Sequence, residues 1–358
     1  MAIDSINRPI LLISNWSTEK LVKSVKEKLS SVLNRNPVEY LHIPQNYFTD
    51  KSPKVRIEKS VRGKHVYIFS DVNNKIDDWS INDKYMFARW ITRAVRHGKP
   101  KTINKAFTTR PYARDDRTEE RKWDDNGTVK MSQLATEVRD DFENYWCDYM
   151  ITMDIHNPDS VKDAKNKMNI VDLPVGRLFN EVIEKEKLDT DNLVYLSTDS
   201  SGSKKIKPIA EDHNVNTYPV EKYRKSWQWQ KVEKTVVFCD EEDIKDKTVI
   251  LYDDMVDTAG SIEKVLNEIL KKKPKEIILL ISHPFLNKDA ISIIENLQER
   301  GIIKCMYTTN SIEHPHLPKC IKIIDIWNII THTIESIVKE TQILHNNNTP
   351  IVVDSSNK

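Results

Sequence analysis

The segment from Thr248 to Ile262 holds the residues of the chain that are best suited to chemistry. It reads TVILYDDMVDTAGSI, so an apolar run that predicts a strand leads into two adjacent acids, a turn sequence and then an amphipathic helix. A loop at the carboxyl end of a parallel strand that leads into a helix presents free backbone N–H groups and the positive end of the helix dipole to an anion. The segment therefore predicts a phosphate site.

The side chains of this segment suggest what the phosphate is attached to. Thr258 and Ser261 add hydroxyl donors, and Gly260 lets the backbone close around a phosphate. Asp253 and Asp254 would repel a phosphate, and their natural partners are sugar hydroxyls or a divalent cation. An acidic loop before an ordinary helix would explain one aspartate, but not an adjacent pair followed by this turn. The segment therefore predicts a sugar-phosphate site.

The same segment resembles the phosphoribosyl-pyrophosphate loop of type I phosphoribosyltransferases and ribose-phosphate pyrophosphokinases. Residues 101–117 favour the second group, because they resemble a pyrophosphokinase segment, ending in Tyr-Ala-Arg-Gln-Asp-Arg, that the transferases lack. Further matches follow in family order between about residues 40 and 335. They are Phe48-Thr49-Asp50, residues 57–63, Met153-Asp154-Ile155-His156, Asp172-Leu173-Pro174-Val175 and residues 197–202, 221–225 and 309–312. The sequence is identified as a divergent member of the pyrophosphokinase family.

This resemblance implies a reaction. The β,γ-diphosphoryl group of ATP would pass to the C1 hydroxyl of ribose 5-phosphate, giving phosphoribosyl pyrophosphate and AMP. Such a transfer depends on cations and positioning more than on covalent catalysis. The resemblance also implies Mg²⁺ as the cofactor and self-association into a dimer or hexamer.

The resemblance assigns roles to individual residues as well. Lys222 and Arg224 would be the catalytic residues and would stabilise charge on the diphosphoryl group. Phe48 would stack on adenine and Asp50 would accept a hydrogen bond from its amino group. The remaining ATP-binding residues would be Arg114, Asp115 and His156. The ribose-phosphate residues would be Asp199, Asp253, Asp254, Asp257, Thr258, Ala259, Gly260 and Ser261. The metal-binding residues would be Asp154, His156 and Asp199, and we expect Asp154 and His156 to face one side of a strand.

Departures from the family pattern leave the identity of the acceptor substrate open. Lys51-Ser52 replaces the usual Gly-Glu, Ser201 replaces a glycine, and the long segment after Lys222 carries Trp227 and Trp229. Two tryptophans on a mobile lid could stack on a second aromatic ring. An alternative acceptor is therefore ADP-ribose, whose terminal ribose has the same free C1 hydroxyl and which belongs to a NAD-rebuilding pathway. We place ribose 5-phosphate first.

A second alternative belongs to another class of protein. The family includes non-catalytic subunits that regulate active ones, and damage to the catalytic loop or to the metal acids would mark such a subunit. Lys222, Arg224, Asp199, Asp253 and Asp254 are all retained. The sequence therefore favours an active enzyme.

The elements that must position these residues alternate along the chain. Strands are predicted at residues 10–13, 65–70, 149–153, 193–196, 248–252 and 277–281, and helices at 83–97 and 262–270. Strands separated by helices imply parallel sheets. We therefore expect an α/β protein of two similar phosphoribosyltransferase-like domains, each with a mostly parallel central sheet flanked by helices. Residues 1–180 would bind ATP, residues 181–344 would bind ribose phosphate and end in a helix able to pack back on the first domain, and residues 345–358 would be a tail.

The composition excludes several other classes of protein. The chain has 358 residues, with 55 Lys and Arg against 54 Asp and Glu, so its net charge of +1 gives no support for a nucleic-acid or membrane-surface binder. No apolar run is long enough to cross a bilayer, and the N-terminal residues do not resemble a signal peptide. Four cysteines without a C-x-x-C pair favour a reducing compartment, and we expect a cytoplasmic enzyme.

Overall fold

The structure is a computed structural model, and it divides the chain into two compact units. Unit 1 comprises residues 1–173 and 326–358, and unit 2 comprises residues 174–325. The structure describes residues 8–33, 36–50, 52–113, 138, 141–142, 144, 147–156, 168–198, 200–224 and 232–347. The side chains at 177, 200–201, 222–224, 232–234 and 341–347 are not described.

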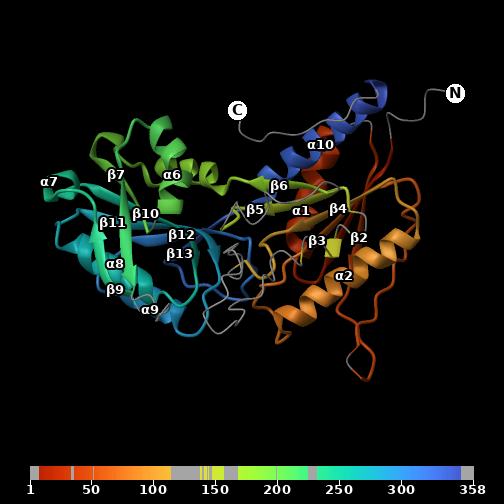
Figure 1. Ribbon diagram of the computed structural model, residues 1–358, viewed down its shortest axis with the longest axis horizontal. Helices are drawn as coiled ribbons and strands as arrows, with labels where there is room; N and C mark the ends of the chain where they lie inside the picture. Colours follow the sequence, from red (N-terminus) through yellow and green to blue (C-terminus); the bar gives the residue numbers. More distant parts are fainter. Residues whose placement is uncertain are drawn as a thin grey trace, which may run out of the picture. The chain divides into compact units, whose positions relative to one another are not determined.

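Unit 1 is built on a six-stranded sheet in which every described pairing is parallel, with the order β2-β1-β3-β4-β5-β6 (Figure 1). The strands are β1 (Ile10–Asn15), β2 (Val38–Ile43), β3 (His65–Ser70), β4 (Thr102–Phe107), β5 (Tyr149–Met153) and β6 (Asn169–Leu173). Every residue of β1 and β3 is buried, as expected for inner strands of a parallel sheet that is covered on both faces.

Three long helices lie in the described part of unit 1. They are α1 (Glu19–Val32), α2 (Ile81–His97) and α10 (Trp327–Asn347). A capping box between Ser80 and Asp83 begins α2, which packs apolar side chains such as Phe87 and Ile91 into the core of this unit. The C-terminal helix α10 contacts α1 although the two are far apart in sequence (Figure 1).

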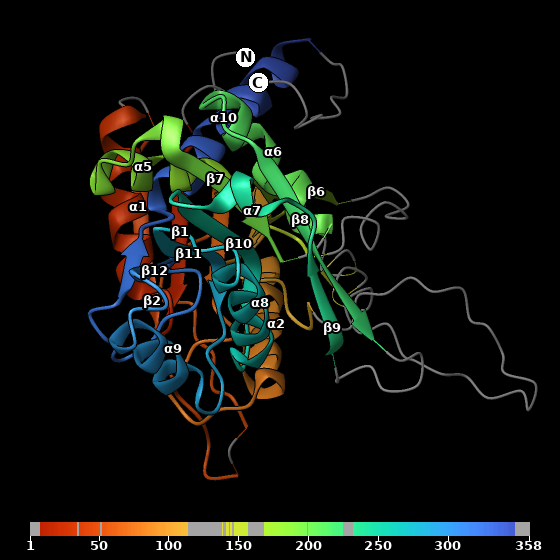
Figure 2. The same cartoon turned by 90° about the vertical axis from the view of Figure 1, so that its left-hand side faces the viewer.

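Unit 2 is built on a seven-stranded sheet with the order β13-β12-β11-β10-β7-β8-β9. Its strands are β7 (Leu193–Ser197), β8 (Thr217–Arg224), β9 (Val232–Val237), β10 (Thr248–Val256), β11 (Glu276–Pro284), β12 (Cys305–Thr309) and β13 (Ile321–Ile324). The pairings are parallel except for the antiparallel pair of β8 and β9, which Figure 2 shows as two long adjacent arrows. Its helices are η1 (Val175–Phe179), α5 (Asn180–Glu186), η2 (Thr190–Asn192), α6 (Ser200–Asp212), α7 (Glu241–Ile244), α8 (Gly260–Leu270) and α9 (Ala290–Glu299).

The strand order reverses once in each sheet, between β1 and β3 in unit 1 and between β7 and β10 in unit 2. Ligands of open α/β sheets bind beyond the carboxyl ends of the strands at such a point. In unit 1 the polar residues there bond to one another: Ser17 Oγ donates to Asn15 Oδ1 at 2.7 Å, and Asn74 Nδ2 donates to the Asp71 carbonyl at 2.7 Å. The corresponding position in unit 2 holds the sugar-phosphate segment, so we place the candidate site there.

The predicted α/β class with two mostly parallel sheets is confirmed. Asn180, near which the sequence analysis placed the domain boundary, is the first residue of α5 in unit 2. Helix α10 extends to Asn347, inside the segment expected to be a tail, and residues 348–358 lie outside the described residues. None of the helices in the described part of the chain combines the length and the apolar character that crossing a membrane requires.

Candidate active site

Asp253 and Asp254 lie within the last residues of β10 rather than after its end. The sequence analysis ended this strand at Tyr252, but β10 stays paired with β11 as far as Val256, opposite Pro284. Its described pairing with β7 stops at Tyr252, so the two strands part before the acids. Strand β10 is therefore extended by its pairing with β11 and not by its pairing with β7. The acids therefore stand where the sheet opens at the reversal of strand order.

The helix that follows begins without a side-chain cap. Its N-cap, Ala259, has a left-handed backbone with φ of 61° and packs its methyl group into the core of unit 2. Alanine has no side-chain oxygen to offer the first turn of α8. The Ala259 carbonyl accepts from the Ile262 and Glu263 N–H groups, which leaves those of Gly260 and Ser261 for another acceptor. An added Cβ on Gly260 would meet no atom within 4 Å. The start of α8 therefore has both the open space and the backbone donors that an anion needs.

Asp257 is held by a neighbouring loop that the sequence analysis missed. Asn287 Nδ2 donates to Asp257 Oδ1 at 2.6 Å, and the Asn287 backbone N–H donates to the Asp257 carbonyl at 2.8 Å. The Leu286 N–H also donates to the Val256 carbonyl at 2.9 Å. No sequence motif marks Asn287, which lies 30 residues from Asp257 and meets it only through the fold. Residues 286 and 287 therefore fix the path of the loop that would bind the phosphate.

Asp254 has a partly buried cationic partner that sequence reasoning also missed. Lys205 Nζ on α6 lies 3.3 Å from Asp254 Oδ2, and the two side chains are 18% and 8% exposed. The Asp254 backbone N–H donates to Asp253 Oδ1 at 3.0 Å, which orients the first carboxylate. The two acids are therefore held in different ways, one by a lysine and one by the backbone.

The predicted catalytic residues lie on a strand rather than on an extended loop. Residues 220–224 of β8 pair with β9, with Lys222 opposite Thr235 and Arg224 opposite Val232. The register shifts between Tyr223 and Arg224, so regular strand alternation is interrupted between the two basic residues. Their side chains lie outside the described part of the structure, as do residues 225–231 with both tryptophans of this segment.

Asp154 and His156 follow β5 in unit 1, but the expectation that they share one face of a strand is wrong. The strand ends at Met153, and Asp154 has a left-handed backbone with φ of 46°, so strand alternation does not apply. The turn is fixed by hydrogen bonds from the Asp154 N–H to the Leu173 carbonyl (3.1 Å) and from the Ile155 N–H to Asp172 Oδ1 (3.1 Å). Non-glycine residues rarely adopt this conformation, and those that do are often found at functional sites.

Phe48 and Asp50 share one exposed loop of unit 1. The Phe48 ring is 52% exposed and Lys54 Nζ lies 5.5 Å from its centre, so aromatic surface remains for a ligand. Asp50 Oδ1 accepts from the Ser52 N–H at 2.9 Å and from Ser52 Oγ at 2.6 Å. These bonds hold the pKa of Asp50 below its usual value. Ser52, a departure from the family pattern, thus engages the carboxylate expected to contact adenine.

Three of the predicted residues, Arg114, Asp115 and Asp199, lie outside the described residues. Within the described part of the chain, no group of three or more His, Cys, Asp or Glu side chains gathers in a way that could hold a metal ion. The structure does bring together Asp253, Asp254 and residues 257–261 at the end of one strand.

The fold defines a phosphoribosyltransferase-like α/β protein. The family profile of the N-terminal domain of ribose phosphate pyrophosphokinase matches residues 10–131, and the phosphoribosyl transferase domain profile matches residues 197–290. The chain belongs to the ribose-phosphate pyrophosphokinase family, which confirms the identification from sequence.

Similar proteins span most of the chain. Ribose-phosphate pyrophosphokinase 1 of Candida albicans is 26% identical over 78% of this chain and 80% of its own length. Ribose-phosphate pyrophosphokinase 4 of Saccharomyces cerevisiae is 26% identical over 85% of this chain and 84% of its own. The crystal structure of phosphoribosylpyrophosphate synthetase from Mycobacterium smegmatis matches with a TM-score of 0.74 and 21% identity, covering 93% of this chain and 100% of that one. The structural likeness supports the same fold.

Proposed function

We propose that this chain transfers the β,γ-diphosphoryl group of ATP to the C1 hydroxyl of ribose 5-phosphate, giving phosphoribosyl pyrophosphate and AMP. The observation that carries the proposal is the open loop between β10 and α8, where two acids precede an uncapped helix N-terminus at the reversal of strand order. The relatives named above are pyrophosphokinases, which supports this reaction over transfer to a nucleobase.

The ribose-phosphate side of the reaction follows from the loop. The N–H groups of residues 257–261, with the Thr258 and Ser261 hydroxyls, would hold the 5-phosphate at the start of α8. Asp253 and Asp254 would accept hydrogen bonds from ribose hydroxyls, which leaves the C1 hydroxyl to attack the β-phosphorus of ATP. Ala259 would serve by its backbone, since its methyl group is buried.

The residues that would bind ATP are proposed from the resemblance to the pyrophosphokinase family. Phe48 would stack on adenine, Asp50 would contact its amino group, and Arg114, Asp115 and His156 would bind the rest of ATP. Lys222 and Arg224 would neutralise charge on the transferring group. When bound, Mg²⁺ would neutralise phosphate charge, and one or two carboxylates are enough because it also binds substrate phosphates. Asp154, His156 and Asp199 would hold it, with Asp253 and Asp254 near the ribose.

We also propose self-association into a dimer or hexamer, which light scattering of the purified protein would measure. We propose a reducing compartment such as the cytoplasm as its location, because the four cysteines include no C-x-x-C pair.

Asp257→Ala and Thr258→Ala test the placement of the 5-phosphate. Each change is expected to raise the KM for ribose 5-phosphate by roughly 10- to 100-fold, because a hydrogen bond involving a charged group is lost. The KM for ATP should change much less. Steady-state kinetics with each substrate varied in turn measures both constants, and Asp289→Ala, an exposed aspartate in the same unit, is the matched control. Equal weakening of both substrates would argue against this placement.

Asn287→Ala tests whether the neighbouring loop positions Asp257. Loss of the 2.6 Å bond should raise the KM for ribose 5-phosphate about tenfold and leave kcat within about twofold. Asn287→Asp, which sets a like charge against Asp257, should be more damaging. The control is Asn296→Ala on the exposed face of α9. If Asn287→Ala lowered kcat and left that KM unchanged, Asn287 would not act by positioning the phosphate loop.

A further inference from the structure

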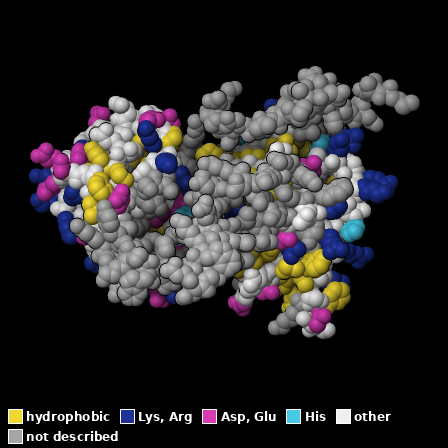
Figure 3. Space-filling model, in the orientation of Figure 1, with side chains coloured by type: hydrophobic (Ala, Val, Ile, Leu, Met, Phe, Trp, Pro, Cys, Tyr) yellow, Lys and Arg dark blue, Asp and Glu magenta, His cyan; other side chains and the backbone are white. Residues whose placement is uncertain are grey.

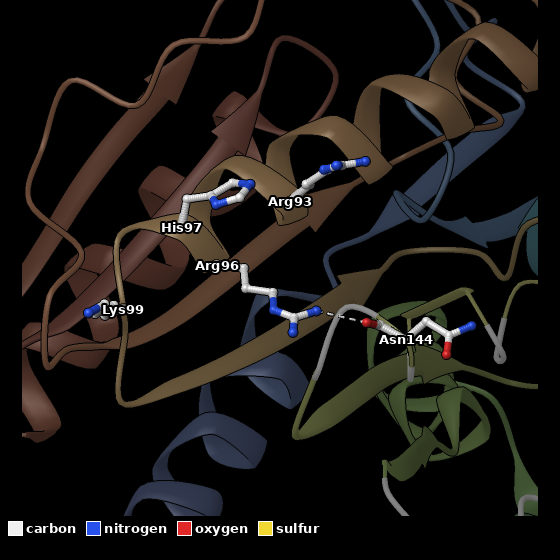
Figure 4. A pocket seen from close by; sticks show the side chains of 5 residues that line it. All are labelled: Arg93, Arg96, His97, Lys99 and Asn144. Carbon is white, nitrogen blue, oxygen red and sulfur yellow. Dashed lines mark hydrogen bonds between the residues drawn. The ribbon is translucent and has the colours of Figure 1, made fainter.

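A pocket with basic walls lies at the C-terminal end of α2, and none of its lining residues is among those assigned above (Figure 4). Its volume is about 430 Å³ and its lining residues are Arg93, Arg96, His97, Lys99 and Asn144. Arg93, Arg96 and His97 share one face of the helix, because residues three and four apart are neighbours there. Figure 3 shows basic side chains and a histidine gathered at the side of the molecule where α2 ends.

The pocket brings several basic side chains together. Among the described residues, no carboxylate lies within ion-pair distance of Arg93 or Lys99, and like charges this close repel. Some basic side chains at other helices do have an acidic partner three or four residues away: Lys23–Glu19, Lys185–Glu181, Lys271–Glu268 and Lys339–Glu335. On α2 itself, Arg89 pairs with Asp141 at 3.0 Å. Within the described part of the chain, the end of α2 therefore brings two positive charges without an ion-pair partner to one pocket.

The helix dipole accounts for only part of this excess. The C-terminal end of a helix acts as about half a negative charge, which offsets roughly a quarter of the two fixed charges on Arg93 and Lys99. General basicity is not the reason either, because the whole chain carries a net charge of only +1. A phosphate group carries about −1.5 to −2 near neutral pH, which matches the charge that is left.

The backbone of the pocket is held in place before any ligand arrives. A Cβ on Gly98 would lie 2.1 Å from Val61 Cγ2, so only glycine fits there, in a chain with seven glycines in all. The Gly63 N–H donates to the Lys99 carbonyl at 3.1 Å, and Lys99 has a left-handed φ of 56°. Arg96 Nη1 donates to the Asn144 carbonyl at 2.8 Å, as drawn in Figure 4. Such preorganisation lowers the cost of binding.

We propose that this pocket binds a phosphate-bearing anion. The planar forks of Arg93 and Arg96 suit bidentate contact with phosphate oxygens, and Lys99 adds a point charge. The volume of the pocket falls in the range of small-molecule sites and exceeds what a single phosphate needs. Trp90, 38% exposed, lies beside Arg93 with the guanidinium 5.7 Å from its ring centre, so a flat surface adjoins the charges. The anion is either inorganic or the phosphate end of a nucleotide.

Calorimetric titration of the full chain tests this proposal without turnover. The probes are inorganic phosphate, pyrophosphate and ADP, each titrated into the wild type, Arg93→Gln/Arg96→Gln and Lys20→Gln/Lys28→Gln. The last variant loses the same charge from exposed positions of α1 in the same unit. At least one probe should show a binding event that weakens tenfold or more in the α2 variant only. Tighter binding of ADP than of pyrophosphate would identify the nucleotide as the source.

Identical isotherms for all three proteins, or no such event in the wild type, would overturn the proposal. Circular dichroism checks that the α2 variant is folded. If the α2 variant is not folded, Lys99→Gln is titrated in its place. Its dissociation constant for the probe that binds the wild type should be at least about threefold higher than the wild-type constant. An unchanged constant for that variant would count equally against the pocket.

Discussion

Lys222→Ala and Arg224→Ala are each expected to lower turnover by about 10²–10³-fold, with little change in ATP affinity. Transfer of a diphosphoryl group spreads charge over several oxygens, and a cation that neutralises this charge in the transition state acts on kcat rather than on ground-state binding. Both residues belong to the paired part of β8, and the register shift between Tyr223 and Arg224 interrupts regular strand alternation between them.

Two measurements separate this role from damage to the hairpin. Turnover is measured by AMP formation at saturating substrates, and ATP affinity is measured by equilibrium binding to the same variants. Lys207→Ala, on the exposed face of α6 and paired only with Glu211 at 3.6 Å among the ion pairs that the described residues show, is the matched control. The double variant should be far less impaired than the product of the two single effects if both residues act on one transition state. Near-normal turnover in either single variant would refute its role.

Lys105→Met is expected to stabilise unit 1 by about 2–4 kcal/mol at pH 7. Lys105 lies on the middle strand β4 with no exposed surface, 4.6 Å from the centre of the Phe107 ring, and its Nζ donates to Ser70 Oγ at 2.6 Å. Burial lowers its pKa to about 7, against an ordinary value of 10.5. Folding therefore works against protonation of this amine, and methionine fills similar space without that cost.

The pH dependence gives the sign of the effect. Because the folded pKa is lowered, the unfolded chain binds more protons between pH 7 and about 10, so wild-type stability should rise with pH over this window. From pH 7 to pH 9 the wild type should gain about 2 kcal/mol more than Lys105→Met. Urea denaturation at both values measures this, with Lys28→Met, an exposed lysine of α1, as control. If Lys105→Met kept the wild-type pH dependence, the buried amine would not be its source.

Local patterns were enough to predict the elements around the site. The apolar run from Thr248, the two acids and the helical periodicity after Gly260 appear in the structure in that order, because strand, turn and helix preferences all agree along this segment. The strand at 65–70 and the strand at 149–153 have the predicted bounds. The family identification rested on short segments that keep their order through the chain, and the family profiles agree with it.

What the sequence did not predict depends on contacts between distant segments. The extension of β10 to Val256 depends on the length of β11, and the hairpin of β8 and β9 joins residues on both sides of a long segment. Asn287 and Lys205 reach Asp257 and Asp254 only through the fold. The left-handed backbone at Asp154 is set by its bond to Leu173 on the next strand. Periodicity along one segment cannot show any of these.

The most direct test of the proposed function is the release of AMP from ATP and Mg²⁺, with ribose 5-phosphate and ADP-ribose supplied in parallel reactions. We predict AMP formation with ribose 5-phosphate, together with phosphoribosyl pyrophosphate in equal amount, and none above background with ADP-ribose. AMP only with ADP-ribose would mean that the loop after β10 serves a larger acceptor. No AMP with either acceptor would contradict the assignment of this chain as an active pyrophosphokinase.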